Sequence, residues 1–123
     1  MFKHILILFF LLLTACTSVN PTPTDSGVEG QVLIGPMCPV VQVGQECPDQ
    51  PYQATLTVNS PTGERIVQVQ TESDGTFKIP LAPGEYILHP ESPNRMPFAQ
   101  EQPFTVETGS FTPLIVQYDS GIR

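Results

Sequence analysis

The sequence is poor in residues on which many protein functions depend. It contains no tryptophan, two histidines, and five lysines and arginines against twelve aspartates and glutamates, for a formal net charge of −7. An acidic chain argues against binding to nucleic acid and against electrostatic docking on anionic lipid. His4 lies in an apolar N-terminal segment, which leaves His89 for the folded part, where we expect it on the surface of a strand. A histidine triad or multi-histidine zinc site is therefore unavailable within one chain, and we expect no enzyme activity and no cofactor.

Long stretches without proline are also scarce. The 14 prolines interrupt nearly every segment that could form a helix. A proline inside a helix costs about 3 kcal/mol or more. After the N-terminal apolar segment, the longest proline-free stretch before the last strand signal is residues 62–79, which is rich in Val, Ile and Thr and is divided by Ser73-Asp74-Gly75. These features predict an all-β fold.

The N-terminus has the layout of a secretory signal peptide over residues 1–15. Lys3 precedes the apolar run Ile5 to Leu13, which is shorter than the roughly 20 residues of a membrane-spanning helix. The four residues from Leu13 to Cys16, "LTAC", resemble the lipobox of bacterial lipoproteins. This resemblance implies lipid on Cys16, membrane contact through that lipid, and a place in the bacterial cell envelope, at the outer membrane if the organism has one.

A tether and one domain are expected after the signal peptide. Residues 16–27 follow the cleavage site and are rich in Pro, Thr and Ser, which is typical of a disordered linker. Residues 28–123 are of a length for one small domain. At its end, Arg123 is placed to pair with Asp119.

Strand signals follow one another at short intervals from Val28 onward. Each is bounded by Gly, Pro, Asn or Asp, and apolar residues alternate with polar ones within it. In residues 65–71, for example, Val67 and Val69 are expected to face inward. Seven short strands separated by such turns predict an antiparallel β-sandwich.

The segments "GVEGQVLIG", "ATLTV" and "TESDGTFKIPLAPGEYIL" and the closing strand, in this order, resemble the carboxypeptidase regulatory-like domain, a prealbumin-like (transthyretin-like) β-sandwich. The family pattern T-x-x-D-G-x-F, a short apolar strand and P-G-x-Y appear in residues 71–88. Asp74-Gly75 fits a tight turn that needs positive φ, Phe77 would fill the core, and Tyr86 would pack inward. The resemblance implies a prealbumin-like fold. The insertion at residues 35–52 departs from the family pattern.

Cys38 and Cys47 lie in this insertion. With Cys16 lipidated they are the two remaining cysteines of an exported protein, which predicts a disulfide. Their spacing is unlike the C-x-x-C of redox catalysts, and zinc would need two more ligands. Glu46 and Asp49 could offer oxygens to calcium, but such sites take about six to eight, so a calcium ion there stays an open alternative.

Two loops carry apolar residues that are candidates for an interaction surface: the insertion and the loop "PESPNRMPFAQEQP". Both could instead fold back and cap the open end of the sandwich, since only contiguous exposed patches indicate binding. The candidate residues are Val40, Val41, Val43, Tyr52, Arg95, Met96 and Phe98.

The sequence therefore predicts a non-enzymatic, lipid-anchored β-sandwich that serves as a structural or protein-interaction module of the envelope. The alternative is a carbohydrate-binding or calcium-dependent accessory protein of a separate envelope enzyme. Glycan sites often use an aromatic platform, yet tyrosine occurs only at Tyr52, Tyr86 and Tyr118. The partner would be an envelope protein in the first case and a glycan in the second.

Overall fold

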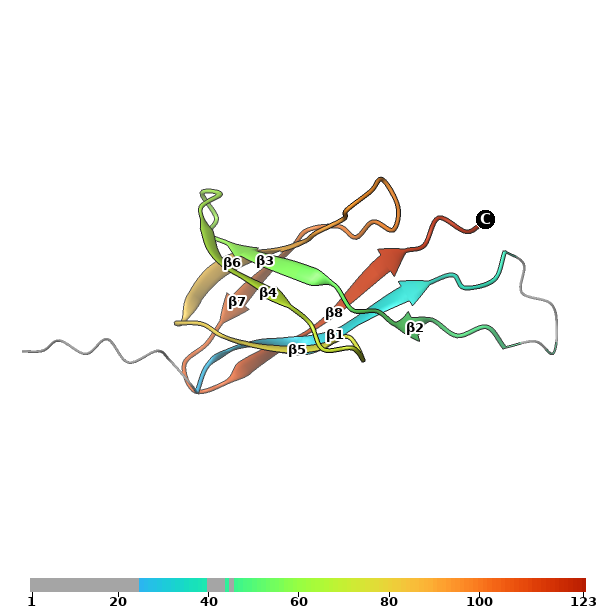
Figure 1. The fold of residues 1–123 in the computed structure, drawn as a ribbon. Coiled ribbons are helices and arrows are strands. Elements are labelled where there is room, and N and C mark those ends of the chain that lie inside the picture. Colours follow the sequence, from blue (N-terminus) through green and yellow to red (C-terminus); the bar gives the residue numbers. More distant parts are fainter. Residues whose placement is uncertain (1–24, 40–43, 45) are drawn as a thin grey trace, which may run out of the picture.

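The protein is all-β in the computed structural model, which describes residues 25–39, 44 and 46–123. Eight strands follow one another along the chain (Figure 1). They are β1 (Gly27–Gly35), β2 (Gln50–Pro51), β3 (Thr55–Asn59), β4 (Arg65–Gln70), β5 (Thr76–Pro80), β6 (Gly84–Pro90), β7 (Gln102–Val106) and β8 (Phe111–Asp119). The predicted all-β class is confirmed. In the described part of the chain no helix is long and apolar enough to cross a membrane.

The strands form two sheets. In the first, β1 lies between β8 on one side and both β2 and β5 on the other. The second has the order β4-β3-β6-β7. The two sheets enclose the apolar core, as a sandwich does.

The expected strand number of seven was wrong, because β2 is an eighth strand. It consists of Gln50 and Pro51, which pair with Ile34 and Leu33 of β1. Two residues are too few for an alternating pattern, so no sequence signal marks this strand. Within the described residues, β1 and β8 form the one parallel pairing, whereas the sequence suggested antiparallel strands throughout.

The core is built from the inward faces of both sheets. Val28, Val32, Val116 and Tyr118 of the first sheet and Leu56, Val58, Leu88 and Val106 of the second are at most 2% exposed. Burying each such Val or Leu side chain contributes about 1.5 to 3 kcal/mol. Val67 and Val69 are half-buried and pack against this core, as their alternation predicts.

The turn between β4 and β5 has the predicted form. Gly75 has a φ of 80°, in the region that favours glycine. Asp74 Oδ1 accepts hydrogen bonds from the Thr76 backbone N–H at 3.0 Å and from the Thr76 hydroxyl at 2.6 Å. These bonds lower the pKa of Asp74. Phe77 follows and is buried, as expected.

The domain begins slightly earlier than the expected boundary at Val28. The strand β1 starts at Gly27, and Ser26 is 1% exposed. The Ser26 hydroxyl donates a hydrogen bond of 2.7 Å to the carbonyl of Leu81. A small polar residue such as serine resembles linker composition, so the sequence alone does not reveal this buried contact.

Cys38 and Cys47 form the predicted disulfide, with their Cα atoms 6.2 Å apart. Their sequence separation is nine residues. A loop of that length restricts the unfolded chain and should stabilise the fold by about 2.5 to 3 kcal/mol.

We therefore expect a variant with Cys38→Ser and Cys47→Ser to lose about 2.5 to 3 kcal/mol of unfolding free energy. Urea denaturation of the variant and of the oxidised parent would measure the loss. Reduction of the parent should reproduce most of it, because reduction removes the same cross-link. A parent whose stability does not change on reduction would contradict the estimate.

Candidate functional site

The strand β8 has an open edge. In its parallel ladder with β1, the Gly27 N–H donates to the carbonyl of Ser110, and the Ser120 N–H donates to the carbonyl of Gly35. Even-numbered residues of β8 therefore turn their backbone groups toward β1, and odd-numbered ones turn them away. The outward backbone groups belong to Phe111, Pro113, Ile115, Gln117 and Asp119.

The strand β7 and the chain that leads into it run alongside this edge but pair with it only in places. Phe98 and Asp119 form an isolated antiparallel bridge, with N···O distances of 3.1 and 2.7 Å. Further along, the Gln102 side chain donates to the carbonyl of Ile115 at 3.0 Å. The Thr112 hydroxyl donates to the carbonyl of Thr105. At Ile115 the two segments are thus joined by the Gln102 side chain. A backbone hydrogen bond there would require the two strands to lie closer together.

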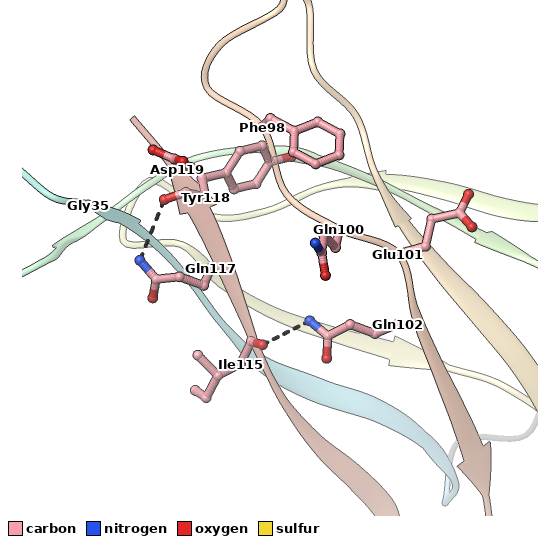
Figure 2. Close-up of a pocket in the computed structure, with 9 residues that line it drawn as sticks. All are labelled: Gly35, Phe98, Gln100, Glu101, Gln102, Ile115, Gln117, Tyr118 and Asp119. Atoms are coloured by element: carbon pink, nitrogen blue, oxygen red, sulfur yellow. Dashed lines mark hydrogen bonds between the residues drawn. The ribbon is translucent and has the colours of Figure 1, made fainter. Parts of the chain in front are cut away.

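A groove lies along this interrupted seam between the Phe98 bridge and Gln102 (Figure 2). Its volume is about 430 Å³, within the range of about 300 to 1,000 Å³ of known ligand sites. One wall comes from β8 with the end of β1, and the other from the chain leading into β7. The lining residues are Gly35, Phe98, Gln100, Glu101, Gln102, Ile115, Gln117, Tyr118 and Asp119.

Large apolar side chains flank the groove and remain exposed. Phe98 is 49% exposed and Ile115 is 57% exposed. Ile115 projects from the outer face of the first sheet, since Leu114 and Val116 on either side of it turn toward the core. Two exposed apolar side chains beside an open strand edge are typical of a binding surface rather than of a solvated strand.

The charged groups of the groove are acidic. Glu101 is exposed, and Asp119 forms an ion pair of 2.9 Å with Arg123, as the sequence suggested. Hydrogen bonds from Arg123 and from the Gly121 N–H lower the pKa of Asp119 to about 2. Asp119 therefore stays ionised in neutral and mildly acidic solution, with its charge balanced by Arg123.

His89 connects β6 to the rim of the groove. Its Nδ1 lies 2.7 Å from Oε1 of Glu101, and its Nε2 lies 3.7 Å from Oε1 of Glu91. Glu91 also accepts a hydrogen bond of 2.7 Å from the Thr57 hydroxyl. The expected position of His89 on a strand surface is confirmed, and its contact orients one oxygen of Glu101.

Of the predicted interaction residues, three share the loop that reaches the groove. Arg95, Met96 and Phe98 are exposed, and of these Phe98 lines the groove. The Met96 side chain lies against Gly121. Cys16, Val40, Val41 and Val43 lie outside the described residues.

Tyr52, the other described candidate, lies away from the groove lining. It is half-buried and packs against the core, with its ring centroid 4.9 Å from that of Tyr118 at an angle of 60°. The edge of one ring meets the other, an arrangement that aromatic pairs favour. Tyr52 therefore packs back against the sandwich, which is the capping alternative considered for this loop.

No group of three His, Cys, Asp or Glu side chains in the described residues could hold a metal ion. Asp49, considered above for calcium, accepts a hydrogen bond of 2.9 Å from the Gln117 side chain. The contact joins the end of the insertion to β8, a structural role that the sequence does not reveal.

Sequence reasoning missed the β8 side of the groove. The alternation of Leu114, Val116 and Tyr118 with Ile115 and Gln117 indicates only that the latter two face outward, as in any ordinary strand. Pro113 was the available signal, since proline lacks an N–H and is confined within sheets to edges and strand starts. It marks β8 as an edge strand. The isoleucine that follows on the same outward face then becomes a candidate for binding.

Comparison with known proteins shows only a similarity of fold. No protein-family model matches the chain, and no curated protein sequence does. Among solved structures, the TIE protein of Bacillus anthracis is similar over 77% of this chain, with 22% identity and a TM-score of 0.50. The chain spans 17% of the length of that protein. The match supports the all-β architecture.

Proposed function

We propose that this chain is a non-enzymatic, lipid-anchored protein of the bacterial cell envelope that binds other envelope proteins through its β-sandwich. The observation that carries the binding function is the groove along β8, with Phe98 and Ile115 exposed beside an incompletely paired strand edge. The proposal keeps the resemblance to carboxypeptidase regulatory-like domains as its family hypothesis.

Two features support the compartment. The disulfide between Cys38 and Cys47 is of a kind that persists in oxidising compartments outside the cytosol. The sequence "LTAC" that ends at Cys16 resembles a lipobox, directly after an apolar run too short to span a bilayer. A protein held at a membrane by lipid gains from a surface that recognises a neighbour.

The glycan alternative gains no specific support from the aromatic residues. Tyr86 stacks on Phe104 with centroids 5.6 Å apart, and Phe104 is buried. The Tyr86 hydroxyl donates to the carbonyl of Ala82 at 2.6 Å. Tyr52 and Tyr118 pack against each other, so these four rings serve the fold.

Anchoring is tested by lipid labelling in cells. With radiolabelled palmitate, we expect the parent to be labelled and Cys16→Ala to be unlabelled and released from the membrane fraction. Globomycin, which blocks lipoprotein signal cleavage, should cause the unprocessed parent to accumulate. A wild-type protein that is secreted without label would contradict the anchoring.

Partner binding is tested by photo-cross-linking in intact cells. A photoreactive residue at position 115 should give a defined protein adduct. The matched control is position 66. Ile66 is also exposed, at 47%, but it lies on β4, at the opposite edge of the second sheet from β7. Equal adducts at both positions, or none at position 115, would argue against the proposed surface.

A further inference from the structure

The open edge of β8 offers a specific set of backbone hydrogen bonds. Pro113 has no backbone N–H to donate. The backbone N–H and carbonyl of Asp119 already form hydrogen bonds with Phe98. Between them, the N–H groups of Ile115 and Gln117 and the carbonyl of Gln117 face the groove. In the described residues they have no backbone partner, and the carbonyl of Ile115 accepts from the Gln102 side chain alone. The free edge is therefore a window of three residues, 115–117.

This window lacks the charged side chains that the edge strands β4 and β5 carry. Exposed edge strands are commonly blunted by charged side chains, lysine above all. The edge strand β5 carries Lys78, and β4 carries Arg65. Residues 115–117, Ile-Val-Gln, carry no charge. The edge thus keeps the features that let an additional strand pair with it.

The surroundings of the window specify the side chains of such a strand. Ile115 and Phe98 offer exposed apolar surface for alternate residues of an added strand. The charged residues that line the groove are both acidic, Glu101 and Asp119, and Asp119 is already paired with Arg123. The chain as a whole has a formal charge of −7. A basic partner is therefore electrostatically favoured, and an acidic one, including a second copy of this chain, is disfavoured.

We propose that the groove binds an extended, basic segment of another protein, which pairs with β8 at Ile115 and Gln117 and places lysine or arginine beside Glu101. The inference rests on the proposed function and deepens it by naming the chemistry of the partner. Main-chain hydrogen bonds to β8 would give affinity. Ile115, Phe98 and Glu101 would select which side chains the bound segment carries.

Amide hydrogen exchange of the full chain in detergent micelles tests the geometry. In the free protein, the amides of Ile115 and Gln117 should exchange quickly, and that of Val116 slowly, because Val116 faces β1. The probe is a library of heptapeptides in which lysine alternates with Val, Ile, Leu or Phe. Saturating amounts of the best member should slow exchange of Ile115 and Gln117 by at least about tenfold and leave Val116 unchanged.

Two matched pairs of variants test which groups the peptide uses. Gln117→Pro removes one outward N–H but no bond to β1, and should weaken binding about fivefold more than Gln117→Ala does. Both variants lose the Gln117 side chain, so contacts with Asp49 cancel in the comparison. Glu101→Gln should weaken binding of the best lysine-containing peptide about threefold. It should not change binding of the same peptide with its lysines replaced by threonine. Unchanged Val116 exchange would show that each variant is folded.

Several results would overturn the proposal. These are slow exchange of Ile115 and Gln117 in the free chain, no protection by any library member, or equal binding by Gln117→Pro and Gln117→Ala. Protection that rises with protein concentration alone would instead assign the edge to a second copy. If no peptide protects the edge but the cross-link at position 115 and the lipid on Cys16 persist, strand addition is wrong and the proposed function stands. Loss of the cross-link at position 115 as well would contradict both strand addition and the proposed binding function.

Discussion

Replacement of Gly30 by alanine is expected to cost about 3 kcal/mol or more of unfolding free energy and to leave much of the protein unfolded. Gly30 pairs with Leu114 across the β1–β8 ladder. A Cβ atom on Gly30 would lie 1.7 Å from the backbone oxygen of Leu114. Backbone cannot turn aside as a flexible side chain can, so the two strands would have to separate.

Urea denaturation of the Gly30→Ala variant would measure the loss. Gly109→Ala is a suitable control, because a Cβ atom at Gly109 meets nothing within 4 Å although its φ is 76°. It should cost only the backbone strain of a left-handed residue, about 1 to 2 kcal/mol. If Gly30→Ala were no more destabilising than Gly109→Ala, the close approach of β1 and β8 would be incorrect.

Truncation of Tyr118 to alanine is expected to remove about 3 to 5 kcal/mol of unfolding free energy, as for other large aromatic core residues. Tyr118 is fully buried, and its ring packs against that of Tyr52. Its hydroxyl donates a hydrogen bond of 2.6 Å to the carbonyl of Glu91. Burial raises the pKa of this hydroxyl, with smaller contributions from Tyr52 and Glu91, so it remains a donor.

The variant Tyr118→Phe separates the ring from the hydroxyl. It keeps the packing with Tyr52 but leaves the Glu91 carbonyl without this donor, which should cost about 1 kcal/mol. Denaturation of both variants gives the contribution of the ring as the difference. A phenylalanine variant as unstable as the alanine variant would show that the hydrogen bond, and not the packing, fixes the loop after β6.

Much of the fold could be predicted because the relevant signals are local. Alternation placed Val67 and Val69 against the core, and Asp74-Gly75 specified a turn through the φ that glycine allows. The disulfide between Cys38 and Cys47 followed from the number of cysteines and from the compartment that the sequence predicts. None of these inferences required knowledge of which strands are neighbours.

The candidate site could not be predicted, because it depends on strand partners that are distant in sequence. The groove exists because β8 pairs with β1 and stays apart from the chain leading into β7. The alternation around Ile115 shows only that this residue faces outward. Whether its backbone faces a neighbour or an open edge depends on sheet order. Pro113 indicates an edge strand but does not show which segment lies beside it.

The pairing of the first strand with the last also affects how the domain comes to fold. β1 is the central strand of its sheet, yet its longest ladder is with β8, which is made only when almost all of the domain has been synthesised. Contacts between such distant segments form slowly, since a long loop must close before they contribute. The chain should therefore remain open during synthesis. That kinetic delay would suit the proposed export, in which the polypeptide is threaded unfolded through a translocation channel.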